Sequence, residues 1–298
     1  MNKKKKVEDY HFLKKPAIHL FGKLVDKYSN YFQPLRESLI MADTKMLFRT
    51  YLSIVFFLTL LVFIIVFILT LAFSLYFKLN IILTVSGLII VPSFFSALTF
   101  FLYYTYPTSM MEKRKSDIEA NLPFAINHMA AIAESGVPPR VIFKVISQFK
   151  EYGEVSRESR KIARNIEVFG LDEIRAIKDV ASRTPSAQFK DLLYGILTAI
   201  QTGGSLKNFL KEESERIMFE YKLKRNKYLQ QLSIYADFYT ALLVAAPFIF
   251  VIILPLLGML GGKIFGFTAQ ELVDFGVYGL IALNLGFLVF LQLTQPKM

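Results

Sequence analysis

Four long uncharged stretches stand out in a sequence whose remaining parts are rich in charged residues. Each is long enough to cross a bilayer, because a helix needs about 20 predominantly apolar residues to span about 30 Å of hydrocarbon. Uncharged runs of this length are rare in the cores of soluble proteins, so we interpret them as membrane-spanning helices. They cover residues 50–77, 79–111, 238–262 and 275–296.

The segment between the second and third stretches holds no run of comparable length. Its longest uncharged run, residues 192–206, is too short to cross a membrane. Apolar residues recur there every three or four positions, as on one face of a helix, and no alternation typical of strands is present. The predicted core face of its first helix consists of Ile118, Leu122, Ile126, Met129 and Ala133.

Residues that end or begin helices divide this segment into about six helices. Glycine commonly follows the last turn of a helix, whereas proline, serine, threonine and aspartate are favoured at the start. The last helix, from Leu206, is expected to run directly into the third span. The predicted breaks are Gly136, Pro138–Pro139, Asp172, Thr184–Pro185 and Gly203–Gly204–Ser205.

An amphipathic helix is predicted before the first span, with Lys23 and Lys27 on its polar side. Two arrangements are open for it: it lies on the anionic leaflet, or it packs on the central segment. The predicted domain boundaries are 1–46, 47–105, 106–236 and 237–298. The apolar side of this helix holds Ile18, Phe21, Leu24, Val25 and Tyr28.

The distribution of basic residues predicts the orientation in the membrane. Residues 1–50 hold 11 lysines and arginines and residues 105–236 hold 21, whereas the two short turns hold only Lys78 and Lys263. Because lysine and arginine concentrate on the cytoplasmic side, both termini and the central segment are expected there. The sequence thus predicts an all-α membrane protein with four transmembrane helices in two hairpins flanking a cytoplasmic helical bundle.

Composition narrows the classes of function. The chain is 54% hydrophobic and carries a net charge of +11 with only 20% charged residues, which suits a protein beside anionic lipid better than a nucleic-acid binder. It has no cysteine, which excludes disulfides and thiolate metal sites. His11, His19 and His128 have no metal-ligand spacing, and Gly261–Gly262–Lys263 lacks the other residues of a phosphate loop. We therefore expect no catalytic residue, metal or cofactor, and no enzyme activity.

Polar residues within the spans are few. Asp237 lies at the mouth of the third span, where we interpret it as an interfacial residue or a helix cap. Asn284 lies mid-span near Ala282 and Gly286, a spacing typical of contacts between helices. The alternative interpretation is a transporter or channel subunit. It is disfavoured because a transport path needs ionisable residues inside the spans, and the spans hold almost none. A lipid-modifying enzyme would need convergent carboxylates or histidines, which the sequence does not offer.

Two groups of basic residues lie in the central segment. Lys222, Lys224, Arg225 and Lys227 precede the third span and are explained by the cytoplasmic excess of positive charge. The other group shares one helical face far from any span, which is either a solvated face or a docking site for an acidic partner. The docking candidates are Arg157, Arg160, Lys161 and Arg164.

A set of ordered motifs resembles the cytoplasmic domain of the type II secretion system F-domain family, and most closely its archaeal branch. That branch contains the platform proteins of the archaellum and of archaeal type IV pili. The start of the domain is matched at 118–119, 122–123, 129–130 and Gly136, and the resemblance covers residues 106–262. Its most specific part is 183–195 (RTPSAQFKDLLYG), 199–206 (AIQTGGSL), 209–210, 214–215 and 220–221.

The resemblance implies a platform protein in the cell membrane at the centre of a pilus-type, archaellum or type II secretion machine. A cytoplasmic hexameric secretion ATPase would dock on it, and its motion would help pilin-like subunits to leave the membrane. Many archaeal relatives carry two such helical domains, so this single-domain chain is expected to act as a homodimer or beside a paralogous subunit, as in tight-adherence pilus systems. The motif positions Gly136, Pro185, Gly203 and Gly204 are expected to shape turns.

Overall fold

The computed structural model describes residues 11–44, 46–77, 80–245, 247–249, 252–253, 256 and 269–294, and these residues form helices joined by turns, without strands. Four helices are long and apolar enough to cross a membrane, within Phe48–Tyr76, Ile81–Ala133, Leu206–Ile249 and Asp274–Gln292. The predicted all-α class with four candidate spans is confirmed. The chain forms two compact units, Met1–Leu210 and Lys211–Met298, and each is described by itself.

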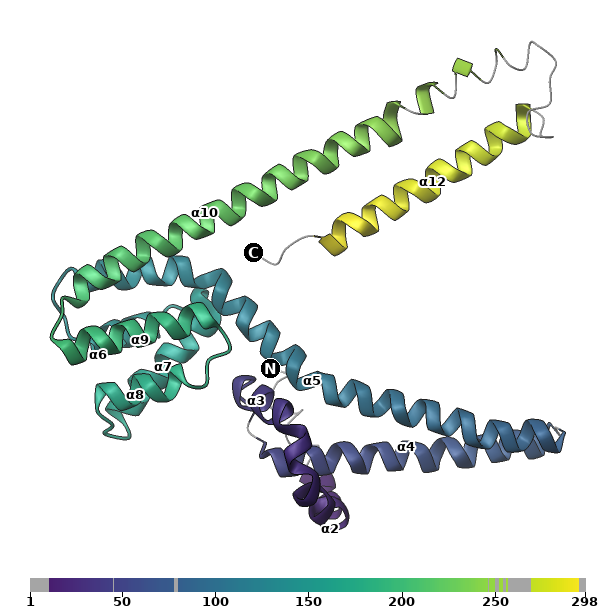
Figure 1. Ribbon diagram of the computed structural model, residues 1–298, viewed down its shortest axis with the longest axis horizontal. Helices are drawn as coiled ribbons and strands as arrows, with labels where there is room; N and C mark the ends of the chain where they lie inside the picture. The colour runs from purple at the N-terminus through teal and green to yellow at the C-terminus, as the bar shows by residue number, and fades with distance from the viewer. Residues whose placement is uncertain are drawn as a thin grey trace. The chain divides into compact units, whose positions relative to one another are not determined.

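The first unit contains an antiparallel helical hairpin formed by α4 (Phe48–Tyr76) and α5 (Ile81–Ala133) (Figure 1). Hydrogen bonds join the two helices near both ends. The Tyr51 hydroxyl donates to the carbonyl of Tyr103 at 2.5 Å, and the hydroxyls of Ser74 and Thr84 lie 2.8 Å apart. Hydrogen bonds between helices are useful in a lipid environment, where no water competes for these groups.

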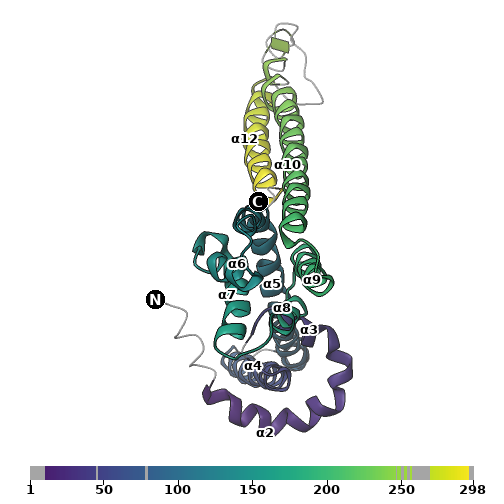
Figure 2. The ribbon, with the colours of Figure 1, turned by 90° about the vertical axis from the view of Figure 1, so that its left-hand side faces the viewer.

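The N-terminal helix α2 (His11–Tyr28) packs against α4, and Figure 2 shows it curving past that hairpin. The Phe21 ring stacks on Phe56 of α4 at 6.1 Å, and Asp26 pairs with Arg49 at 2.7 Å. Of the two arrangements left open, packing on the central bundle is not the one observed, because the aromatic start of α4 provides the apolar surface for this helix. A turn at Ser29–Phe32 and helix α3 (Gln33–Met41) follow.

Helix α5 continues without a break from the hairpin into the helical bundle. The predicted domain boundary between residues 105 and 106 lies inside this helix of 53 residues. Helix α5 changes direction along its length in Figure 1, as interior prolines commonly cause; Pro92, Pro107 and Pro123 lie within it. The hydropathy pattern marks where the hydrocarbon ends but not where the helix ends.

Four short helices pack with the second half of α5 to form the bundle. They are α6 (Pro139–Ile146), α7 (Gly153–Glu167), α8 (Glu173–Ala181) and α9 (Ala187–Thr202). The predicted core face of α5 is confirmed, since its five residues are all buried: Ile118, Leu122, Ile126, Met129 and Ala133. A 3-10 turn, Lys150–Tyr152, leads into α7.

Most of the predicted helix breaks are confirmed. Gly136 and Gly203 have φ values of +73° and +70° just after helices, Pro139 is the first residue of α6, and Asp172 accepts a hydrogen bond from the Arg175 amide at 2.6 Å. The Ser205 hydroxyl likewise accepts from the amide of Asn208 at the start of α10.

The prediction for the start of α9 is wrong. Its cap is Ser186, whose hydroxyl accepts a hydrogen bond from the Phe189 amide at 3.3 Å, rather than Thr184. Pro185 therefore lies before the helix. Serine is favoured at this position because its short side chain reaches the free amides of the first turn.

The second unit contains two antiparallel helices that lie side by side in Figures 1 and 2. Helix α10 (Leu206–Tyr239) begins in the last residues of the first unit and is followed by a π-helical segment, Thr240–Ala245; α12 (Ala269–Thr294) is its neighbour. The prediction that the last bundle helix runs directly toward the third span is confirmed. Pro255, Gly261–Gly262–Lys263 and Lys78 lie outside the described residues.

Candidate functional site

Helix α7 carries the predicted basic face, and its first turn is fixed by a carboxylate from α5. The Glu154 amide donates to Asp117 Oδ2 at 2.6 Å, which satisfies one of the free N–H groups of the helix start and places a negative charge at its positive end. Gly153 has φ +52°, and a Cβ at this position would overlap the Asp117 carboxylate. Only glycine fits here without strain.

His128 supports the turn that precedes α7. Its Nδ1 lies 3.2 Å from the Tyr152 hydroxyl, and its ring meets the Phe149 ring edge to face at 4.6 Å. Burial, and to a smaller extent the charge of Glu151, raise the pKa of Tyr152, so its phenol stays protonated. Among the residues with described positions, no group of three or more His, Asp or Glu side chains could hold a metal ion.

A buried ionic network joins α7 to α5 and to the end of α3. Arg114 of α5 pairs with Glu154 at 3.0 Å and with Glu158, and it also donates to the carbonyl of Met41. Glu158 is only 1% exposed. A buried pair of this kind needs every charge to be compensated, because an uncompensated charge in the interior is costly.

Lys161 extends the network on its outer side. Its Nζ lies 3.0 Å from Glu158 and 2.9 Å from Asp43, which follows α3 in the left-handed conformation (φ +53°) that aspartate tolerates. Burial raises the pKa of Glu158, an effect that the charges of Lys161 and Arg114 oppose and that of Asp43 reinforces. Three segments distant in sequence are thus tied together by charge.

The structure divides the four predicted docking residues into two groups. Lys161 has a side chain only 25% exposed and belongs to the buried network. Arg157, Arg160 and Arg164 lie on the exposed side of α7: the first pairs with Glu154 at 2.6 Å, and the second donates to the Ser147 carbonyl at 2.8 Å. The sequence did not show that the network lies beneath this face, because apolar periodicity gives no signal for buried charges.

A close contact between helices explains two of the motif residues. A Cβ at Gly195 of α9 would overlap the ring of Phe209, which lies in the first turn of α10. The glycine therefore lets α10 start close against α9. Both residues belong to the motif, but their contact could not be inferred from the sequence. Gly204 makes no comparable close contact and lies in the turn after Gly203.

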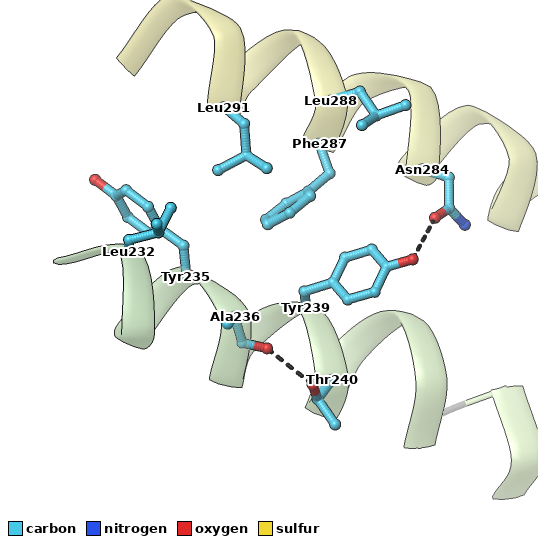
Figure 3. A pocket seen from close by; sticks show the side chains of 9 residues that line it. All are labelled: Leu232, Tyr235, Ala236, Tyr239, Thr240, Asn284, Phe287, Leu288 and Leu291. Carbon is cyan, nitrogen blue, oxygen red and sulfur yellow. Dashed lines mark hydrogen bonds between the residues drawn. The ribbon is translucent and has the colours of Figure 1, made fainter. Parts of the chain in front are cut away.

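The second unit contains a pocket of about 400 Å³ between α10 and α12 (Figure 3). Most of its lining residues are apolar, but Tyr235 and Thr240 also line it, and the Tyr239 hydroxyl donates to Asn284 Oδ1 at 3.4 Å. The expected role of Asn284 in helix contact agrees with this bond. Ala282 and Gly286 are exposed and do not contribute to the contact, since a Cβ on Gly286 would meet nothing within 4 Å. Asp237 is also exposed.

Comparison with known proteins shows which family the bundle is similar to. Residues 125–254, which include the helices α6 to α10, match the family model described as Type II secretion system (T2SS), protein F. The predicted resemblance is confirmed. The matched residues include the basic face of α7, the Gly195–Phe209 contact and the turns at Gly136 and Gly203.

The curated relatives are archaeal. An uncharacterised protein of Methanocaldococcus jannaschii is 29% identical over 150 residues, which is 50% of this chain and 25% of the relative. Flagella accessory protein J of the same organism and of Methanococcus voltae are 27% and 28% identical over 155 residues, 51% of this chain and 28% of each relative. The aligned part therefore spans about a quarter of each relative. No solved structure matches the chain.

Proposed function

We propose that this chain is a platform protein of a type IV pilus-like, archaellum or type II secretion machine. In this role it docks a cytoplasmic hexameric secretion ATPase and couples the motion of that ATPase to the assembly of pilin-like subunits. The observation that carries the proposal is the unbroken helix α5, which runs from an apolar span into the F domain. A second copy or a paralogous subunit completes the platform, and no nucleic acid takes part.

A continuous helix suits the transfer of force. Helix α5, with 53 residues, is about 80 Å long at 1.5 Å per residue. Displacement of its bundle end is passed along the helix toward its membrane end, because backbone hydrogen bonds keep the helix stiff between Pro92, Pro107 and Pro123. The transporter alternative finds less support, since ionisable side chains are few in the apolar spans.

The proposal requires the F domain to face the cytoplasm, and the absence of cysteine makes this testable. Lys190 is exposed on α9, so Lys190→Cys introduces one accessible thiol into the bundle. A membrane-impermeant maleimide added to intact cells should leave this thiol unmodified and should react with it after the cells are broken. Labelling of intact cells would contradict the orientation and the ATPase role together.

Docking is tested by co-purification of the detergent-solubilised chain with the hexameric secretion ATPase of the same organism. The double change Arg160→Glu and Arg164→Glu reverses two exposed charges and spares the residues bound to Glu154 and Glu158. We expect it to weaken binding, most clearly at low salt. Lys207→Glu with Lys211→Glu, which reverses two exposed charges on α10, is the matched control. Wild-type chain that fails to bind the ATPase at any salt concentration would refute the proposed function.

A further inference from the structure

Three large apolar side chains are exposed together at the turn between α7 and α8. Val168, Phe169 and Leu171 are 70%, 63% and 36% exposed. Phe169 follows Ile162 and Ile166 at the spacing of one helical face, but α7 ends at Glu167. The chain turns away there, and the Phe169 side chain extends outward instead of joining the core.

Backbone hydrogen bonds hold this apolar tip in one conformation. The Val168 amide donates to the Arg164 carbonyl at 2.9 Å, and the Leu171 amide donates to the Asn165 carbonyl at 3.0 Å. Gly170 has φ +66°, which allows the tight reversal. A partner that binds such a tip spends little free energy on ordering it, because the loop is already fixed.

The tip continues the basic face of α7. Arg164 lies one turn before Val168, and its guanidinium carbon lies 5.6 Å from the centre of the Phe169 ring, in a cation–π arrangement. Arg157 and Arg160 precede it on the same face. Aromatic and arginine side chains are the residues that most often dominate the binding energy of protein interfaces.

We propose that the tip formed by Val168, Phe169 and Leu171 is the apolar anchor of the docking face. Its partner is a protein surface with an apolar pocket bordered by carboxylates, which would accept Phe169 beside Arg164. The inference rests on the proposed function, in which that partner is the ATPase. An anionic membrane surface is the other occupant that the test below distinguishes.

The test is the affinity of the full chain, in nanodiscs of neutral lipid, for the purified secretion ATPase of the same organism. Phe169→Ala should weaken binding at least about tenfold, as expected for a central aromatic anchor. Phe219→Ala is the matched control, because that phenylalanine is 67% exposed on α10. The elution profile and helical circular dichroism should not change in either variant, since both side chains are exposed.

Salt separates the two parts of the docking face. The loss caused by Phe169→Ala should persist at high salt, whereas the loss caused by Arg164→Glu should shrink, because screening acts on charge and not on apolar contact. Equal affinity of wild type and Phe169→Ala would overturn the inference and leave the proposed function standing. Wild-type chain that binds no ATPase would overturn both.

Two further outcomes would also overturn the inference. A change of oligomeric state on Phe169→Ala would show that the tip contacts a second copy of this chain. An environment-sensitive dye on Phe169→Cys, the only thiol in that variant, would report insertion into lipid if its emission shifted on adding anionic lipid alone. The inference expects the shift only when the ATPase is added.

Discussion

Replacement of Arg114 by methionine should open the contact between α7 and α5 while leaving the rest of the bundle helical. The substitution removes the positive charge that faces Glu158, which is 1% exposed, and Glu154. Removing one partner of a buried ion pair costs about 3–5 kcal/mol, because the other charge stays in the interior uncompensated. Lys161 still pairs with Glu158 at 3.0 Å, which places the expected cost at the lower end, about 3 kcal/mol.

Hydrogen exchange measures this cost where it occurs. Each 1.36 kcal/mol changes an equilibrium tenfold, so a loss of about 3 kcal/mol should speed exchange of the α7 amides by about a hundredfold or more. The control is Arg216→Met. Arg216 pairs with Glu213 and Glu220 but has a side chain 51% exposed, and surface pairs of this kind contribute about 0–1 kcal/mol.

A double substitution decides whether charge compensation is the cause. Arg114→Met with Glu158→Leu replaces both partners by apolar side chains of similar size, a change that is often neutral or stabilising. Glu154 keeps Arg157 at 2.6 Å, and Lys161 keeps Asp43 at 2.9 Å, so no other charge is stranded. The double variant should therefore recover most of the lost protection. If it exchanges as fast as Arg114→Met alone, the electrostatic reasoning is refuted.

Three other substitutions test the packing and the charge around the bundle. Gly153→Ala should lower the thermal midpoint more than Gly170→Ala does: both sites have positive φ, which costs about 1–3 kcal/mol, but only the first also meets a carboxylate. Gly195→Ala should destabilise the chain by about 1–3 kcal/mol through overpacking, and adding Phe209→Ala should reverse part of the loss. Burial raises the pKa of Glu158 above its ordinary value of 4.5, so its contribution to stability is full below pH 4.5 and is lost as the pH rises through the raised pKa. Glu158→Gln should therefore give a thermal midpoint that falls less as the pH is raised from 4.5, and an identical pH profile for the two proteins would contradict this assignment.

The spacing of apolar residues predicts much of the fold. The four spans, the core face from Ile118 to Ala133 and most helix breaks follow from periodicity and turn residues. The junction near residue 105 does not, because a helix that leaves the membrane changes its polarity without ending. The cap of α9 was missed for a local reason: Thr184 and Ser186 both have hydroxyls, and only the backbone path decides which one reaches the first turn.

The exposure of the basic face of α7 was predicted only in part, because basic residues at helical spacing give no indication of depth. Lys161 lies between two arginines of the exposed face, yet its ammonium turns to Glu158 and Asp43. The exposure of Phe169 was also hidden, since a phenylalanine three residues after Ile166 fits the apolar face of a longer helix. Because α7 ends at Glu167, Phe169 lies outside the helix and is exposed. No residue before Gly170 indicates that the helix ends there.

Helix α7 presents different chemistry on its two sides. In the proposed function, one side docks the ATPase and the other passes its motion to α5. Its outward side carries Arg160, Arg164 and the Phe169 tip, whereas its inward side is fixed to α5 by Glu158. The 15 residues of α7 make a rod about 22 Å long. Under the proposed function, a push on the outward side would pass through this stiff element to the buried ion pair, and from there to α5. On this reasoning Arg114→Met should retain affinity for the ATPase but lose fibre assembly, whereas Phe169→Ala should lose both; equal loss of affinity in the two variants would show that α7 does not separate the two tasks.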